Sequence, residues 1–314
     1  MAVETDEPGR LIVPSRGTLG FLLCAGVLVL LFAKPLVGVF KLAWSSDLHS
    51  HALLIPFLSI YLIWIRKPAI ADISIQRAPV WAAGVSALAL LPLAALWNQF
   101  RLGQLDLASA DALFFGAIGF VTLLIGVGLW FFGSKIVGAV AFPVLMLFFI
   151  APLPESVQGR IEHFFQTTSA YAALGLFRVA GIPVVFDRLI FNLPTITLEV
   201  APECSGIRSS LVLFITSLVA GHLFLQSPWK RAVLTVLVIP LAIARNGFRI
   251  FVIGYLCVRV DPNLIHSWVH RQGGPLFFVL SLVPFFALLV WLRRSESGAS
   301  VRSHRQPSSA TLSR

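Results

Sequence analysis

Three side chains that together can break an amide bond occur far apart in this hydrophobic chain. They are Cys204, Arg249 and His270. A cysteine thiolate can attack a carbonyl carbon, an arginine can stabilise the resulting oxyanion, and a histidine can protonate the leaving amine. Acyl transfer by these residues requires a fold that brings all three to one place.

The composition indicates a polytopic membrane protein. Hydrophobic residues make up 57% of the 314 positions and charged residues only 12%, and the mean hydropathy is +0.88. Soluble domains carry about 25% charged residues. The net charge of +10 does not indicate nucleic-acid binding, because the basic residues are scattered between apolar segments, as topology signals are.

Apolar runs long enough to cross a bilayer need about 20 residues each. The sequence predicts an all-α membrane protein with about eight such spans. Their approximate bounds are Leu19–Phe40, Ala52–Ile65, Val80–Trp97, Ala112–Phe132, Ile136–Ile150, Cys204–Leu225, Arg231–Val258 and Gly274–Leu292. The second is short, and Gly133-Ser-Lys135 is read as a tight turn before the fifth.

A region of different character separates the fifth and sixth spans. Glu155 to Pro183 mixes charged and apolar residues at helical spacing, which predicts an amphipathic helix at an interface or against the bundle. Val184 to Val200 is rich in β-branched residues and predicts a short hairpin or extended segment.

The predicted organisation has three parts. Residues 1–18 form an N-terminal segment and residues 19–292 the transmembrane domain, with an insertion at about 151–203. Residues 293–314 are rich in Ser, Arg and Gln and are predicted to form a disordered basic tail.

The distribution of Lys and Arg predicts the orientation. Eight spans place both termini on one side, and that side receives most of the basic residues of the short loops, namely Arg66, Lys67, Arg77, Lys135, Lys230 and Arg231. The opposite short loops hold only Lys41, Arg101, Arg259 and Arg271. We therefore expect cytoplasmic termini and an insertion that faces outward.

This orientation brings the three reactive residues to one face. Cys204 begins the sixth span and His270 precedes the eighth, both on the outer side. Arg249 lies 19 residues beyond Lys230 at the inner end of the seventh span. At about 1.5 Å per residue the two positions are ~28 Å apart along the helix, close to the ~30 Å thickness of the hydrocarbon core. Arg249 is therefore also expected at the outer face.

The residues around Cys204 resemble a helix start. Pro202 is read as the first helical position, which would place the thiol at the positive end of a helix dipole and favour the thiolate. Arg208, four residues on, would share its helical face, and Gly206 would leave room for a substrate backbone. The alternative is a small buried residue at a helix start. Cys24 and Cys257, within apolar runs, are read as inert.

The seventh span contains two arginines one turn apart, Arg245 and Arg249. Charges inside membrane spans cost a few kcal/mol and usually mark function. Asn246 could orient either arginine, and either His266 or His270 could face the site. The alternatives are arginines that reach the outer headgroups or pair structurally, and a structural interfacial histidine.

These motifs resemble the exosortase/archaeosortase family in order, spacing and span assignment, over about Trp44 to Trp291. The motifs that carry the resemblance are Cys204-Ser-Gly-Ile207, Asn246-x-x-Arg249 and His270-x-x-x-Gly274, with weaker likenesses at His51 (with Pro56, Tyr61, Trp64 and Arg66), at Ala151-Pro-Leu-Pro154 and at Gly181-Ile-Pro183. This chain departs from the pattern in Gly247-Phe248 within the second motif and in a longer basic tail, which leaves the substrate subclass open.

The resemblance implies an integral membrane cysteine protease or transpeptidase of the bacterial inner membrane. It implies Cys204, Arg249 and His270 as catalytic residues, supported by Ser205, Gly206, Arg208, Arg245, Asn246, His266 and His51. The implied substrates are exported proteins whose C-terminal signal combines a Pro-Glu-Pro-like motif, an apolar helix and a basic cluster. Membrane lipids are the other expected partners, and neither a metal nor an organic cofactor is needed.

Two other functions stay open on the sequence. The intramembrane arginines could bind an anionic substrate in a transporter or channel, although no internal repeat is detected. The chain could also be a membrane enzyme of exopolysaccharide assembly, although its loops lack an acidic metal-binding or phosphate-binding motif. Loss of the Cys204 thiol should leave transport intact but abolish thiol chemistry.

The predicted orientation can be tested with topology reporters. A reporter fused after Arg294 should be active in the cytoplasm, and one inserted near Asp187 should be active outside. Compartment-specific reporter activity in whole cells measures both. If both reporters lie on the same side of the membrane, the three reactive residues cannot meet as proposed.

Overall fold

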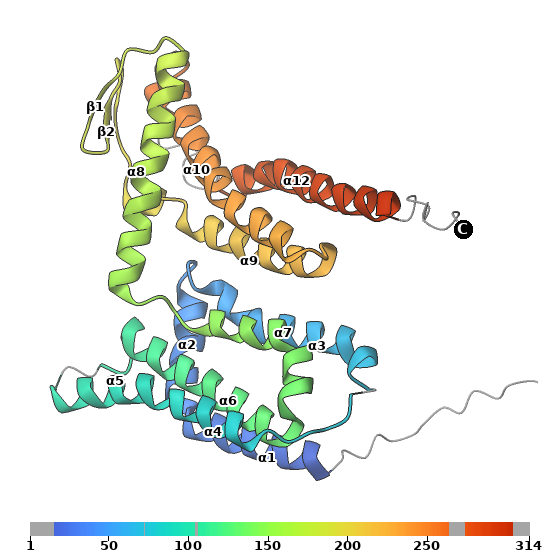
Figure 1. The fold of residues 1–314 in the computed structure, drawn as a ribbon. Helices are drawn as coiled ribbons and strands as arrows, with labels where there is room; N and C mark the ends of the chain where they lie inside the picture. The colour runs from blue at the N-terminus through green and yellow to red at the C-terminus, as the bar shows by residue number, and fades with distance from the viewer. Residues whose placement is uncertain (1–15, 72, 104–105, 264–273, 304–314) are drawn as a thin grey trace, which may run out of the picture. The chain divides into compact units, whose positions relative to one another are not determined.

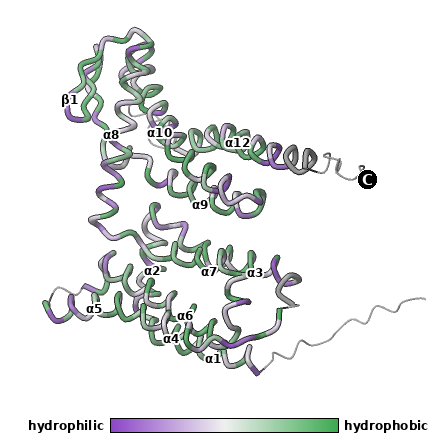
Figure 2. Tube along the Cα trace, in the orientation of Figure 1, coloured by the Kyte–Doolittle hydropathy of each residue, from purple (hydrophilic) through white to green (hydrophobic). Residues whose placement is uncertain are grey.

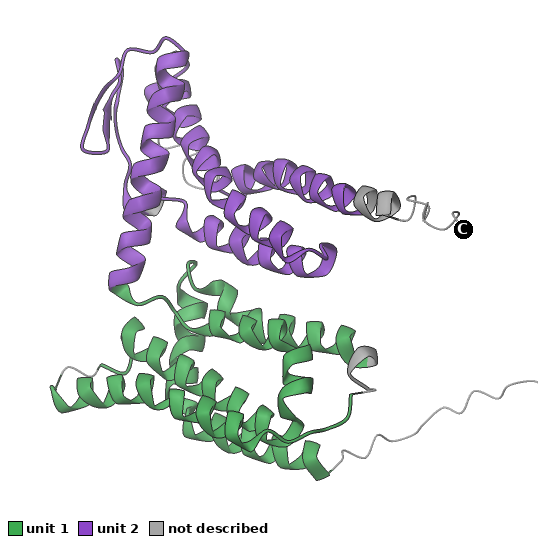
Figure 3. Cartoon of the chain, viewed as in Figure 1, with its two compact units in different colours: residues 1–155 green, residues 156–314 purple. Residues whose placement is uncertain are grey.

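The fold is described from a computed structural model, in which residues 16–71, 73–103, 106–263 and 274–303 are placed well enough to describe. The chain divides into two compact units, Met1–Glu155 and Ser156–Arg314 (Figure 3).

The first unit is entirely helical in its described residues (Figure 1). Its elements are α1 Arg16–Leu31, α2 Ala33–Ser45, η1 Ser50–Leu53, α3 Ile55–Ala71, α4 Pro79–Leu88, α5 Leu90–Arg101, α6 Ala110–Ala139, α7 Ala141–Met146 and η2 Leu147–Ile150. Helix α6 is central, since α1, α2, α4 and α5 all pack against it.

Glycines allow the neighbours of α6 to approach closely. A Cβ at Gly116 would lie 2.6 Å from Cβ of Pro35 on α2, and one at Gly126 would collide with Ser86 on α4. Small residues are common where helices meet in membrane bundles. Helices in lipid associate mainly through close van der Waals packing, because the hydrophobic effect does not drive them together there. The core of this unit also includes Leu113 and Val39.

The second unit combines helices with a small sheet. Its elements are α8 Glu155–Val179 (which begins one residue before the unit boundary), β1 Val185–Asp187, β2 Ile190–Asn192, β3 Thr197–Glu199, η3 Pro202–Cys204, α9 Ile207–Phe224, α10 Pro228–Arg259 and α12 Gly274–Ser303. The strands are antiparallel in the order β1-β2-β3, with Phe191 of β2 opposite both Phe186 and Leu198. The segment read as a hairpin thus contains three short strands.

The apolar face of α8 packs against α10 and the sheet. The shared core includes Phe177 of α8, Phe191 of β2, and Ile250 and Cys257 of α10. Gly247 makes this approach possible, because a Cβ there would lie 2.7 Å from Cβ of Ala172 and 3.0 Å from the carbonyl oxygen of Ser169. The amphipathic helix therefore lies against the helices of its own unit. A second core joins α9, α10 and α12.

The chain is a multi-pass membrane protein. In the described residues, five helices are long and apolar enough to cross a membrane, or up to seven spans if each of two bent helix pairs counts as one. Large apolar side chains cover the surfaces of these helices, for example Leu30 (77% exposed) and Trp81 (69% exposed). Figure 2 shows apolar residues along most helices, as lipid contact requires.

The count of eight spans is not confirmed, and two of the expected spans take another form. The expected fifth span is divided. Helical geometry breaks at Gly133 (φ 80°, ψ 172°), where a tight turn was predicted, and the helical residues beyond it end at Ala139, with only the short α7 and η2 after them. The expected second span corresponds to α3, which has 17 residues and includes Arg66 and Lys67. Both are shorter than the ~20 apolar residues of a typical span.

The last helix of the second unit extends beyond the expected eighth span. Helix α12 continues past Leu292 to Ser303. Glu296 accepts hydrogen bonds from the backbone N–H groups of Gln226 (3.0 Å) and Ser227 (2.9 Å), and Lys230 donates to Ser295. These bonds tie the end of α12 to the α9–α10 connection, which the polar composition alone did not reveal. Residues 304–314 lie outside the described residues.

The α8–α10 contact yields a stability prediction. Gly247→Ala should destabilise the protein by about 1–3 kcal/mol, because the added methyl group meets backbone atoms of α8 that cannot move aside. Gly175→Ala on α8 is the matched control, since a Cβ there meets nothing within 4 Å. It should be neutral or stabilising by up to about 1 kcal/mol. Thermal unfolding in detergent measures both, and equal midpoints for the two variants would contradict the packing argument.

Candidate active site

Cys204 lies in a short turn between the sheet and α9. Its backbone N–H donates to the carbonyl of Ala201 at 2.8 Å, and that of Ser205 donates to Pro202 at 3.0 Å, which makes the 3₁₀ turn η3. Gly206 then adopts a left-handed conformation (φ 75°, ψ 10°), and α9 begins at Ile207. Only glycine takes this conformation without steric cost.

This geometry corrects two expectations. Cys204 does not lie in the first turn of α9, so the helix-dipole argument for its thiolate does not hold, since the dipole acts mainly within that turn. Arg208 does not share a helical face with Cys204, because the left-handed Gly206 interrupts the helix between them. Arg208 is instead exposed on α9.

A substrate backbone cannot use the space beside Gly206, contrary to expectation, because side chains of α10 occupy it. A Cβ there would lie 2.9 Å from Cγ and Oδ1 of Asn246 and 3.2 Å from Nη2 of Arg245. The absent side chain therefore makes room for two residues of α10. This contact joins the turn that carries the cysteine to the helix that carries the arginines.

Asn246 holds the cysteine turn by its side-chain amide. Its Nδ2 donates to the carbonyl of Cys204 at 2.8 Å and to that of Ser205 at 3.0 Å. Asn246 is 2% exposed and Ser205 1% exposed, so water does not compete for these bonds. Asn246 was expected to orient an arginine, and in the structure it contacts the backbone of Cys204 directly.

Arg245 also contacts the start of α9. Its Nη2 lies 3.3 Å from the carbonyl oxygen of Gly206 and 3.3 Å from Oγ of Ser210. The side chain is 8% exposed, and Ser210 in turn donates to Gly206 at 2.8 Å. Arg245 is thus part of the polar network that holds the turn.

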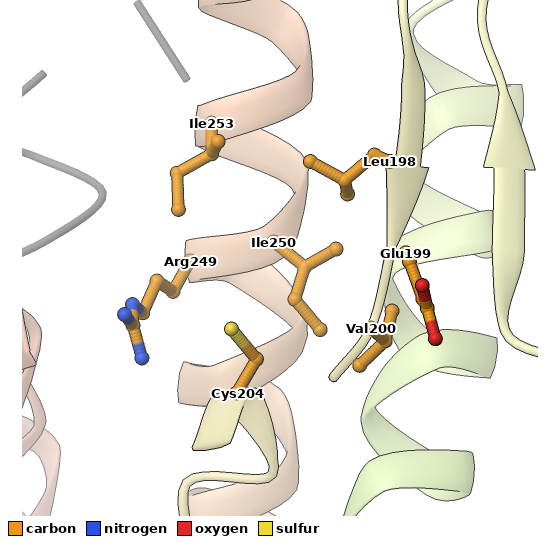
Figure 4. A pocket seen from close by; sticks show the side chains of 7 residues that line it. All are labelled: Leu198, Glu199, Val200, Cys204, Arg249, Ile250 and Ile253. Atoms are coloured by element: carbon orange, nitrogen blue, oxygen red, sulfur yellow. The ribbon is translucent and has the colours of Figure 1, made fainter. Parts of the chain in front are cut away.

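Arg249, one turn further along α10, lines a small pocket together with Cys204. The rest of the lining is Leu198, Glu199, Val200, Ile250 and Ile253. Figure 4 shows the sulfur of Cys204 between the guanidinium of Arg249 and the side chain of Ile250. Both Cys204 and Arg249 are half-buried. The structure thus brings together two of the three residues proposed as catalytic.

Two residues of this neighbourhood were missed by the sequence analysis. Glu199 of β3 contributes to the pocket lining, with its exposed carboxylate pointing away from Cys204 (Figure 4). Gln166 of α8 is 9% exposed, and its Nε2 donates to the carbonyl of Val200. A glutamine on the apolar side of an amphipathic helix was a usable signal, since a buried amide needs a partner.

The three predicted histidines are not among the described residues that line this pocket. His266 and His270 lie outside the described residues. His51 belongs to the first unit, where its Nδ1 lies 3.0 Å from the carbonyl oxygen of Leu48. Burial lowers the pKa of His51, against the opposing effect of hydrogen bonds with the carbonyls of Leu48 and Phe149. Within the described part of the chain, no group of three His, Cys, Asp or Glu could hold a metal ion.

Comparison with known proteins places the chain in a family. The family model described as transmembrane exosortase (Exosortase_EpsH) matches residues 43–287, which include the cysteine turn, α10 and the segment with His270. No match was found among curated proteins or among solved structures. The match covers well over half of the chain and agrees with the resemblance noted in its motifs, so the protein belongs to the transmembrane exosortase family.

Proposed function

We propose that this protein is a membrane-embedded cysteine protease and transpeptidase that cleaves a C-terminal sorting signal of exported proteins. The observation that carries the proposal is the shared pocket of Cys204 and Arg249. Family membership supports a role of this kind on exported substrates. The substrate signal is proposed to combine a Pro-Glu-Pro-like motif, an apolar helix and a basic cluster.

In the proposed mechanism, the Cys204 thiolate attacks the scissile carbonyl carbon, and the C=O electron pair moves onto oxygen. Arg249 donates hydrogen bonds to this oxyanion from the pocket wall. The intermediate collapses when the C–N bond breaks and His270 gives a proton to the leaving amine. The product is a thioester between the substrate and Cys204.

The thioester is resolved by a second nucleophile. Water gives a free carboxylic acid, whereas an amine or hydroxyl of an envelope lipid or glycan gives an anchored protein. The same histidine accepts the proton of the incoming nucleophile, and the thiolate leaves. In the proposed orientation this chemistry takes place at the outer surface of the bacterial inner membrane, with both termini in the cytoplasm.

The first test concerns the nucleophile. Cys204→Ala and Cys204→Ser should abolish cleavage of a reporter protein that carries the tripartite signal, measured by its size on immunoblots of whole cells. Cys24→Ser is the control and should cleave normally, because Cys24 is exposed on α1 in the other unit. Normal reporter cleavage in Cys204→Ala would exclude thiol chemistry. The activity of a transporter or channel would not depend on the thiol.

Thiol labelling provides an independent test. A membrane-impermeant maleimide should label Cys204 in preference to Cys24 and Cys257. Cys204 is half-buried in the pocket lining, Cys257 is fully buried, and Cys24 is exposed on an apolar helix expected to face lipid. Mass spectrometry of the labelled peptides gives the ratio. Preferential labelling of Cys257 would shift the candidate nucleophile to α10.

The arginines should differ in their roles. Arg249→Ala should lower the cleavage rate about 10²–10³-fold, the usual effect of losing an oxyanion donor. Arg249→Lys should be severely impaired too, since lysine lacks the planar fork. Arg245→Ala should mainly reduce stability and membrane level, because Arg245 bonds to Gly206 and Ser210. Normal cleavage by Arg249→Ala, with loss in Arg245→Ala or Arg208→Ala at equal protein levels, would disprove this assignment.

A further inference from the structure

The segment that carries Cys204 is held by its backbone carbonyl groups. Four of them accept hydrogen bonds from side chains of two helices. Gln166 of α8 donates to Val200, Asn246 of α10 donates to Cys204 and Ser205, and Arg245 of α10 donates to Gly206. All three donor residues are buried.

The two carbonyls bound by Asn246 precede α9. The first backbone bond of α9 runs from the N–H of Ser210 to the carbonyl of Gly206 at 3.0 Å. The carbonyls of Cys204 and Ser205 come before this point, at a place where the left-handed Gly206 has turned the chain. A buried carbonyl without a donor destabilises the fold. The side-chain nitrogen of Asn246 carries two N–H groups, so it can donate a hydrogen bond to each of these two carbonyls.

The fit depends on both partners. A Cβ on residue 206 would lie 2.9 Å from the amide of Asn246, so only glycine lets the amide approach this closely. In turn, Asn246 fixes the carbonyl of Cys204 itself, and therefore the peptide plane that follows the cysteine Cα atom. This plane restricts the direction in which the Cα–Cβ bond, and with it the thiol, can point.

From this geometry we infer that Asn246 is the positioning residue of the nucleophile. By binding the carbonyls of Cys204 and Ser205, it aims the thiol into the pocket that Arg249 lines. The inference rests on the proposed function for its kinetic consequence. Its structural part, the orientation of Cys204, does not depend on any reaction. Misplacement of a reacting group by about 1 Å can cost roughly 100-fold in rate.

The sharpest variant is Asn246→Asp. It has nearly the same shape, but the Nδ2 donor is replaced by an oxygen that faces two carbonyl oxygens. The matched control on the same helix is Thr235→Val, which removes a side-chain hydrogen bond to the carbonyl of Arg231 at 3.0 Å. Thr235 lies about 16 Å from Asn246 along α10, at 1.5 Å per residue.

The first measurement needs no substrate. In full-length protein with Cys24→Ser and Cys257→Ala, a nitroxide attached to Cys204 reports the mobility of the turn by electron paramagnetic resonance in proteoliposomes. The spectrum should show a more mobile label in Asn246→Asp than in the parent, and no change in Thr235→Val. Equal mobility in all three proteins would overturn the inference, whatever the reaction.

The second measurement separates positioning from general damage. With the tripartite-signal reporter in proteoliposomes, Asn246→Asp should lower kcat about 100-fold with little change in KM. The rate of alkylation of Cys204 by iodoacetamide should stay within a few-fold of the parent, because a small reagent can approach a misdirected thiol from many sides. The melting temperature should fall somewhat below that of Thr235→Val, because two carbonyls lose their donor, but Cys257 should stay unreactive in protein that retains it.

Other outcomes are equally informative. A large fall in melting temperature, with Cys257 becoming reactive in protein that retains it, would show that Asn246 only holds the fold, and would overturn the inference. Parent-like kcat in Asn246→Asp, with Cys204→Ala inactive, would do the same while leaving the proposed function intact. Full cleavage by Cys204→Ala would disprove the proposed function, and the label mobility would then decide the structural part alone.

Discussion

The contact between Gly206 and Asn246 is the constraint on which the candidate site depends. A left-handed glycine lets a buried amide of α10 reach two carbonyls of the turn that carries Cys204. Without this approach, the turn would leave polar backbone groups unpaired in an apolar surrounding, which is costly. Because the same helix carries Arg249 one turn further on, the contact that satisfies the turn also sets the cysteine beside the arginine.

The surrounding packing keeps this contact in place. Gly247, next to Asn246, lets α8 lie directly on α10, and α8 in turn supplies Gln166 to the carbonyl at the end of the sheet. The sheet closes the other side of the pocket with Leu198 and Val200, which belong to the same core as Phe177 and Ile250. Small residues for close approach and buried amides for backbone carbonyls are thus combined at one level of α10.

The sequence predicted the helical membrane class, the family and the proximity of Cys204 and Arg249 better than it predicted the local geometry around them. Apolar length reveals spans, but it cannot show that the helix after Gly133 ends at Ala139 or that α12 continues past Leu292. The helix-start pattern at Pro202 was read as the beginning of α9, whereas it begins a 3₁₀ turn that Gly206 ends. A positive φ at a glycine depends on tertiary contacts, here with Asn246 and Arg245, and periodicity does not reveal it. Gln166 was missed for a similar reason, since it donates to the carbonyl of Val200, 34 residues further along the chain.

The two arginines of α10 illustrate how a membrane helix can carry charge at a reactive site. Arg245 is buried, and its Nη2 donates hydrogen bonds to the carbonyl of Gly206 and to Oγ of Ser210. These bonds partly offset the free-energy cost of removing its charge from water. Arg249 lies one turn further on, half-buried in the pocket lining. Two like charges this close repel each other in a medium of low dielectric constant, and an oxyanion formed in the pocket would relieve that repulsion. In the proposed mechanism, this charge distribution would stabilise the anionic transition state of carbonyl attack more than the neutral substrate, as catalysis requires.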